Sequence, residues 1–296
     1  MPVQAFVLVL AAALLHATWN LIAKRSGGDH RFAFLTAVGV TVIWAPAAWW
    51  FGADELPRWG LVEWGVLGAS AVVHVGYYLA LLRGYREADL TVVYPLARGS
   101  APLVTVAGAV LLLGERFTLA TALGVGAVCG GVFLVAGGPS LWRSARGAHD
   151  AAARRRVRAG LAWGALTGLL IAGYTVIDGY AVKVMLLGPV LFDYLGNVLR
   201  VPLQAPLVWR ERATLADQWR RHWRAVLAIS AMGPLAYILV LYAVRMAPLS
   251  HVAPAREVSM LFAALIGGRL LGEADRGLRV AGAACIAAGV AALAMG

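Results

Sequence analysis

The sequence predicts an all-α integral membrane protein of ten transmembrane helices, arranged as two inverted five-helix repeats. Three observations lead to this prediction: an apolar composition, repeated apolar runs that can cross a bilayer, and motifs that recur in the second half. Hydrophobic residues make up 61% of the 296 positions and charged residues 14%, against about 25% charged in ordinary soluble domains. The mean hydropathy of +0.75 agrees. This composition argues against one or two soluble domains.

Runs of about 20 mainly apolar residues, the length of a membrane-spanning helix, recur along the chain. Short charged or Gly/Pro segments separate them. The first run lacks the basic start and the small-residue cleavage site of a signal peptide, so we expect it to remain as the first helix. The expected spans are 3–23, 32–52, 61–82, 91–113, 119–136, 160–182, 189–208, 225–244, 250–271 and 279–295.

One connection is longer and more polar than the others and divides five spans from five. It contains Arg143, Arg146 and the run Arg154–Arg156. We therefore expect a first repeat over residues 1–138, a basic cytoplasmic linker over 139–159, and a second, inverted repeat over 160–296.

The distribution of positive charge predicts the orientation. With these spans, 19 Lys and Arg residues lie in odd-numbered connections and 4 in even-numbered ones. Because Lys and Arg collect in cytoplasmic loops, the odd connections are expected in the cytoplasm and both termini outside. The net charge of +11 is then mainly a topology signal, and no nucleic-acid partner is expected.

Internal similarity predicts the inverted repeat. Tyr78–Ser100 matches Tyr237–Ser259 at a constant offset, with Tyr, Ala, Pro and Ser in common. Since each half has an odd number of spans, the second half must enter the bilayer upside down, as in alternating-access transporters with a site near the midplane. Small-residue spacings such as Gly126–Gly130 predict close helix packing. Further recurring elements are Leu113–Gly114–Glu115 with Leu271–Gly272–Glu273, Gly124 with Gly282, and Gly131 with Gly289.

These features resemble the drug/metabolite transporter superfamily in its EamA-type branch. The resemblance covers nearly the whole chain and rests on ten spans, two five-helix halves and a Gly-Glu after the fourth and ninth spans. The opening Leu15–Asn20 segment with Lys24 is similar to a subset of that branch, some members of which accompany phosphonate-use genes. The resemblance implies a transporter in the cell inner membrane. Many relatives are thought to keep both termini in the cytoplasm, whereas the charges here place them outside.

Ionisable residues inside the apolar spans are candidates for a site, because such groups are costly in hydrocarbon unless they face a bundle interior or water. Arg98 and Arg256 lie at similar depths in spans four and nine, each shortly after a proline, Pro95 or Pro254. Two guanidinium groups converging from opposite faces would clamp a carboxylate, phosphate or phosphonate. The alternative is an internal ion pair, for instance between Arg98 and Glu257.

Other polar residues fall into two groups. Glu257 and Asp178 are candidates for proton coupling or for ion pairs, since a buried carboxylate can exchange protons during a transport cycle. His16 and Asn20 share a helix face, and their alternatives are substrate contacts or interhelical hydrogen bonds. Asn197 lies on a stripe with Asp193 and Arg200, for which a self-contained ion pair between the last two is the alternative. The remaining candidates for substrate binding are Trp19, Tyr78, Tyr94 and Tyr237, with His74 and Tyr77 in the same polar-aromatic patch.

A secondary transporter of a small polar metabolite, anionic or zwitterionic (amino-acid-, carboxylate- or phosphonate-like), is the leading prediction. No Walker-type loop predicts ATP hydrolysis. The alternatives are a flippase of a lipid-linked sugar, an amphipathic drug exporter and, from scattered histidines alone, a membrane-embedded enzyme. Cys129 and Cys285 lack metal-ligand spacing. We expect no metal, no cofactor and no catalytic residue, and a monomer or homodimer in the lipid bilayer.

Overall fold

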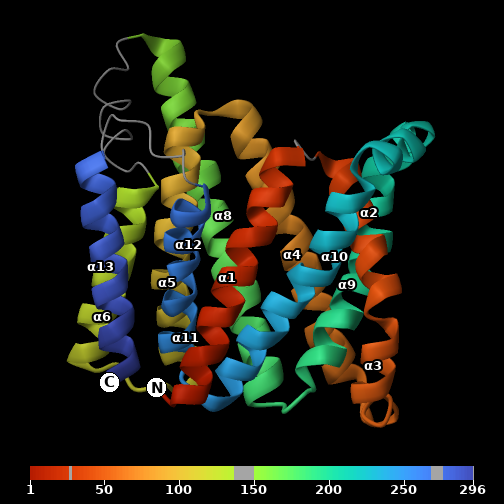
Figure 1. Cartoon of the computed structure of the whole chain (residues 1–296), viewed down its shortest axis with the longest axis horizontal. Helices are drawn as coiled ribbons and strands as arrows, with labels where there is room; N and C mark the ends of the chain where they lie inside the picture. Colours follow the sequence, from red (N-terminus) through yellow and green to blue (C-terminus); the bar gives the residue numbers. More distant parts are fainter. Residues whose placement is uncertain (27–28, 137–149, 268–275, 296) are drawn as a thin grey trace.

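The computed structural model is a bundle of long, roughly parallel helices (Figure 1), described for residues 1–26, 29–136, 150–267 and 276–295. The helices of the first half are α1 (Val3–Ser26), α2 (His30–Ile43), α3 (Ala45–Gly52), α4 (Leu61–Glu87), α5 (Leu90–Leu113) and α6 (Leu119–Val135), with a 3-10 turn, η1, at Leu56–Arg58. Those of the second half are α8 (Ala151–Lys183), α9 (Pro189–Val208), α10 (Leu215–Met246), α11 (Leu249–Ala255), α12 (Ser259–Gly267) and α13 (Arg276–Met295), with 3-10 segments η2 (Trp209–Thr214) and η3 (Arg256–Val258). The part of the chain so described contains no strand.

Several helices are long and apolar enough to cross a bilayer. Six pass a test of length and composition among the described residues, namely α1, α4, α5, α8, α10 and α13, and the bent pair α2–α3 would be a seventh. The helix α6 is apolar but shorter. The described part of the chain is thus all-helical with multiple apolar spans. Length and composition identify six or seven of the ten expected spans.

The second expected span, 32–52, is bent rather than straight. The axes of α2 and α3 differ by 48°. The break lies at Trp44, and Pro46 occupies the first turn of α3. A proline lacks the backbone N–H that a continuous helix needs and is best accommodated in a first turn.

Two helices begin earlier than hydropathy predicts. The helix α8 starts at Ala151, where the Asp150 carboxylate accepts a hydrogen bond from the Ala153 N–H at 2.6 Å. Residues 151–159 of the expected linker are therefore helical, and its remainder lies outside the described residues. Likewise α10 starts at Leu215 instead of 225. Hydropathy marks only the apolar part of a helix, while Ala and Arg continue it into water at little cost.

The two repeat-related prolines have different effects. The helix α5 continues through Pro95 to Leu113. The corresponding second-half segment stops just after Pro254, turns through η3 and resumes as α12. Both rings lack the N–H that would donate to the preceding turn, but only Pro254 is followed by a break in its helix. The end of the expected span 250–271 lies beyond the described residues.

The halves pack against each other by equivalent contacts. The helix α1 packs on α10 as α4 packs on α8, and α12 packs on α1 as α5 packs on α8. The pairs α2–α9 and α6–α13 each join equivalent helices. Exchanging the two halves therefore reproduces the main contacts, as a two-fold relation between them requires.

Glycines let α6 and α13 approach closely. A Cβ on Gly131 would lie 2.5 Å from the Gly282 carbonyl oxygen, and one on Gly289 would lie 2.6 Å from that of Gly124. Recurring glycines of one half thus meet those of the other. The prediction for Gly126–Gly130 is wrong, because a Cβ at either position would meet nothing within 4 Å.

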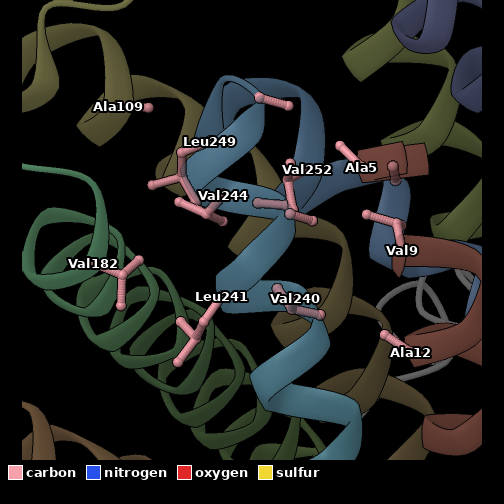
Figure 2. Close-up of a cluster of buried hydrophobic side chains, with 14 of the residues drawn as sticks. Ala5, Val9, Ala12, Ala109, Val182, Val240, Leu241, Val244, Leu249 and Val252 are labelled. Carbon is pink, nitrogen blue, oxygen red and sulfur yellow. The ribbon is translucent and has the colours of Figure 1, made fainter. Parts of the chain in front are cut away.

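Apolar side chains fill one end of the bundle. Both chain termini lie at this end (Figure 1), and Figure 2 shows α1, α8, α10 and α11 contributing to the cluster. Of its members, Val9 and Val252 have no exposed surface, and Leu241 and Leu249 have almost none. We call this the closed end, and the opposite end, where α1 ends and α2 begins, the open end.

Candidate functional site

A cavity of about 410 Å³ lies between the two halves of the bundle. Ala12, Ala13 and Val240 line it near the closed end, and Asp29 and Ala33 line it at the start of α2. The cavity therefore extends from the apolar cluster towards the open end. This main cavity is lined by α1, α2, α4, α5, α8, α9, α10, η3 and α12.

A second cavity of about 180 Å³ adjoins the first. It reaches between α4 and α5, where Leu81, Tyr85 and Tyr94 line it. We call it the side cavity. The residues common to both cavities are His16, Trp19, Tyr77, Arg98, Tyr174, Arg256 and Glu257.

Arg98 forms an ion pair with Glu257 between α5 and η3. The distance from Nη1 of Arg98 to Oε1 of Glu257 is 3.8 Å. The other carboxylate oxygen, Oε2, is buried and has no hydrogen-bond partner in the structure. The ion pair that the repeat alignment suggested is therefore present, and it lies where the two cavities meet.

Arg256 has a different environment, although it is the neighbour of Glu257. Its guanidinium carbon lies 5.5 Å from the centroid of the Tyr237 ring, in a cation–π arrangement. Among the described residues, no carboxylate lies within 4 Å of its guanidinium nitrogens. Its donors are thus available to an anion in the cavity.

Asp178 lies at the centre of a buried hydrogen-bond network. It is 1% exposed. Its carboxylate accepts hydrogen bonds from Ser70 Oγ at 2.5 Å and from the Tyr237 hydroxyl, and His74 Nε2 lies 3.8 Å away. The His74 ring stacks on Tyr174 with centroids 3.8 Å apart. Three helices, α4, α8 and α10, are joined by this network.

The stripe on α9 lines the main cavity, and the ion pair weighed as the alternative is not formed among the described residues. Asn197 donates to the backbone oxygen of Asp193 at 2.8 Å and to its carboxylate at 3.1 Å. Arg200 then donates to the Asn197 side-chain oxygen at 3.3 Å. Arg200 and Asp193 do not pair directly, because they are seven residues apart on the helix and the Asn197 amide lies between them.

The residues predicted on α1 and α4 reach the cavities. His16 and Trp19 line both cavities, in edge-to-face contact at 4.8 Å between ring centroids. Asn20 lines the side cavity, and its amide donates to the His16 backbone oxygen in the same helix, so the interhelical bond weighed for it is absent. Tyr78 lines the main cavity and donates to the Asp29 backbone oxygen at 3.4 Å.

The structure thus brings every candidate together. Arg98, Arg256 and Glu257 line both cavities, Tyr94 the side cavity, and Asn197 and Tyr237 the main cavity, while Asp178 joins through Tyr237.

Sequence reasoning missed Gln204, which lies one helical turn beyond Arg200 and lines the main cavity. Its position at i+4 on the stripe was the available signal. It belongs to a set of buried polar atoms without hydrogen-bond partners, which otherwise cost free energy and so indicate a missing ligand or water. Those in residues lining the main cavity are Trp19 Nε1, Arg200 Nε, Gln204 Oε1 and Glu257 Oε2.

His251 lines neither cavity. His251 accepts or donates to Thr121 Oγ1 at 3.2 Å and contacts the Leu293 backbone oxygen, in the packing of α6, α11 and α13. Within the described residues, no three His, Cys, Asp or Glu side chains form a group that could hold a metal. Cys129 and Cys285 are free thiols.

A polar cavity enclosed by apolar spans in a doubled bundle is typical of a membrane transporter for small molecules. The model of the EamA-like transporter family matches both halves, over residues 4–137 and 158–295. This chain therefore belongs to the EamA-like transporter family, as its sequence motifs suggested, and it is a multi-pass membrane protein. Members of this family are transporters rather than enzymes.

Comparison with solved structures shows the same fold. One solved structure, described as "Crystal structure of protein", matches with a TM-score of 0.73 and 17% sequence identity. The match covers 100% of this chain and 98% of the other chain. At this identity the likeness concerns the fold alone. No curated protein matches the chain.

Proposed function

We propose that this protein is a secondary transporter that moves a small anionic or zwitterionic metabolite by alternating access. The observation that carries the proposal is a cavity between the halves that presents the unpaired Arg256 guanidinium together with buried, unpartnered polar atoms. A polar solute would satisfy those atoms. Amino-acid-, carboxylate- and phosphonate-like solutes all offer the acidic group that an arginine binds through two parallel hydrogen bonds.

The proposed architecture is ten crossing segments in two inverted repeats, over 1–138 and 160–296. The bend in α2–α3 and the interruption at η3 divide two of these segments, and the exchange symmetry of the helix contacts supports the relation between the halves. Inverted repeats allow two alternative packings of similar energy, which is the basis of alternating access.

The proposed location is the cell inner membrane with both termini outside. The support is the excess of Lys and Arg in odd-numbered connections, 19 against 4, since such residues remain in the cytoplasm. In this orientation the open end faces the cytoplasm and the closed end faces outward. The structure would then correspond to the inward-facing state.

The experiment is a binding screen on purified protein followed by transport in vesicles. Glycine, L-alanine, succinate and methylphosphonate would be tested for an increase in thermal midpoint, and each hit for uptake as a labelled solute. Arg256→Ala should abolish the increase. Arg220→Ala is the matched control, because its side chain is 79% exposed and lies near the start of α10, outside both cavities. Absence of any hit, or a hit unchanged in Arg256→Ala, would contradict the proposal.

An amphipathic drug exporter is a second candidate. The side cavity favours it, since Leu81, Tyr85 and Tyr94 would accommodate an apolar or aromatic group beside the charged residues. Transport of hydrophobic cations or dyes by the purified protein, with no response to small acids, would select this alternative.

A further inference from the structure

Tyr237 lines the main cavity and connects Arg256, which lines it too, with Asp178, which lies buried behind it. Its hydroxyl donates to Asp178, and its ring lies under the Arg256 guanidinium. We propose that Asp178 is a proton-binding site coupled to anion binding at Arg256 through Tyr237, so that solute and proton are bound together. This inference rests on the proposed function and names its driving ion.

The Asp178 carboxylate is held by hydrogen bonds rather than by a direct ion pair with Arg or Lys. Ser70 and Tyr237 donate to it, and the nearest basic nitrogen, His74 Nε2, is 3.8 Å away. No Arg or Lys nitrogen lies within 4 Å of it in the part of the chain that the structure describes. A carboxylate in direct contact with arginine stays ionised throughout a cycle. The charge on Asp178 depends instead on groups at longer range.

The charged and titratable groups around Asp178 come from every neighbouring element. His74 lies on α4, Tyr174 on α8 itself, and Tyr237 on α10. The remaining charged groups come from the α9 stripe and from η3. On α5, the charge of Arg98 is balanced by that of Glu257. The groups on α9 and η3 are Asp193, Arg200 and Arg256.

An anion that binds Arg256 changes the balance at Asp178. The positive guanidinium favours the ionised carboxylate, and the low dielectric of the buried site makes this effect strong. A bound anion cancels that positive charge. Asp178 then takes up a proton from a hydronium ion in the water of the cavity, so that one O–H bond of the hydronium ion breaks, one O–H bond forms on the carboxyl group, and water is left. By linkage, protonation of Asp178 strengthens anion binding by the same factor.

The hydrogen bonds from Ser70 and Tyr237 adjust this response. Both donors favour the ionised carboxylate, and in the proposed cycle Asp178 is ionised in the empty site and accepts a proton when the solute arrives. Tyr237 acts as a positioning residue. When the solute leaves on the other side of the membrane, Arg256 is exposed again and the proton returns to water, so that solute and proton cross together.

The test measures protons taken up when a probe binds. Succinate, which stays ionised from pH 6.5 to 8, would be titrated into the purified protein in two buffers of different ionisation enthalpy. Uptake approaching about one proton per bound solute is expected for the unmodified protein, with affinity rising as the pH falls. Asp178→Asn should bind succinate without proton uptake and without pH dependence.

Two further variants separate this role from a structural one. Asp217→Asn removes an exposed carboxylate at the start of α10, outside both cavities, and should keep the proton uptake. Tyr237→Phe keeps the ring under Arg256 but loses the hydroxyl that favours ionised Asp178, so the empty site is already protonated and uptake falls. This variant tests the idea even if Asp178→Asn does not fold.

The outcomes distinguish this inference from the proposed function. If succinate binds the unmodified protein without proton uptake, or if Asp178→Asn retains the uptake, the coupling is wrong and the transporter proposal stands. If none of the screened solutes binds at all, the proposed function fails and the coupling fails with it.

Discussion

The closed and open ends of the bundle are built from the same repeat, yet their interiors differ. The closed end is filled by apolar side chains of α1, α8, α10 and α11 (Figure 2). Towards the open end, the equivalent space is a cavity with arginines, carboxylates and tyrosines. The two halves therefore occupy different conformations, and in the proposed alternating access these conformations would be exchanged.

The clearest difference between the halves lies at the repeat-related prolines. The helix α5 is continuous through Pro95, whereas Pro254 ends α11 and places Arg256 and Glu257 in a 3-10 turn. Glu257 thereby reaches Arg98 across the interface. A short non-helical step inside a membrane protein is tolerated where it lines a cavity, which is where η3 lies.

A polar contact also holds the closed end together. Glu115 follows Gly114, which has the left-handed φ of 66° that favours glycine at a helix end. The Glu115 carboxylate accepts hydrogen bonds from Lys183 Nζ at 2.8 Å and from the backbone N–H groups of Leu249 at 2.7 Å and Ser250 at 2.9 Å. This contact joins the α5–α6 turn to α8 and α11. The repeat-related Glu273 lies outside the described residues.

The largest expected effect concerns the packing of α6 on α13. In Gly131→Ala the new Cβ would lie 2.5 Å from a backbone oxygen and 2.8 Å from the Ile286 backbone nitrogen, neither of which can rotate away. We expect a loss of about 3 kcal/mol in the free energy of unfolding. Gly130→Ala is the control, since its Cβ meets nothing within 4 Å. Thermal midpoints in detergent measure both, and equal midpoints would contradict the packing.

The next prediction compares the accessibility of the two ends. In a protein with Cys129 and Cys285 replaced by alanine, Ala33→Cys lines the cavity and Val252→Cys has no exposed surface. A water-soluble maleimide should modify the cavity position roughly tenfold faster or more, because the closed end must open first. Mass spectrometry of the intact protein gives both rates. Comparable rates would mean that water and the maleimide reach the interior of the closed end, and would contradict the prediction.

Breaking the Glu115 contact should loosen the closed end without affecting the cavity. In Glu115→Gln the new amide group faces the Leu249 and Ser250 donors and one of them loses its partner, at a cost of about 1–3 kcal/mol. Labelling of Val252→Cys should accelerate in this background, while labelling of Ala33→Cys should not. Glu63→Gln on the exposed first turn of α4 serves as the matched control, and an effect of the same size there would remove the special role of Glu115.

The smallest expected effect is a pH dependence of the same contact. Burial opposes ionisation of Glu115, but the hydrogen bonds from Lys183, Ser250 and Leu249 outweigh it, so the pKa of Glu115 lies below its ordinary value of 4.5. A carboxyl group with a lowered pKa in the folded state stabilises the protein at pH values above its ordinary pKa. This contribution is lost as the pH falls through the pKa of the folded state. Acidification below pH 4.5 should therefore lower the thermal midpoint of both proteins, and the decrease should be smaller for Glu115→Gln than for the unmodified protein.

Much of the fold was predictable, because apolar runs and recurring motifs are local properties of the chain. The positions of the helices, the division into two halves and the family all followed from them. The helix breaks at Trp44 and Pro254 and the early starts of α8 and α10 did not, since hydropathy does not register where a helix bends or continues into water. Among the glycines, composition did not distinguish Gly131, which packs, from Gly130, which does not.

The candidate site was predictable as a set of residues, and the Arg98–Glu257 ion pair only as one of two alternatives. The sequence by itself determined that Arg98, Arg256 and Asp178 lie within apolar segments, because charged residues in such segments are rare and readily seen. Only the tertiary structure decided that Arg98 meets Glu257, that Arg256 stays unpaired over Tyr237, and that Tyr237 donates to Asp178. These contacts depend on the rotation of each helix about its axis and on the break at η3. Both result from the packing of the whole bundle.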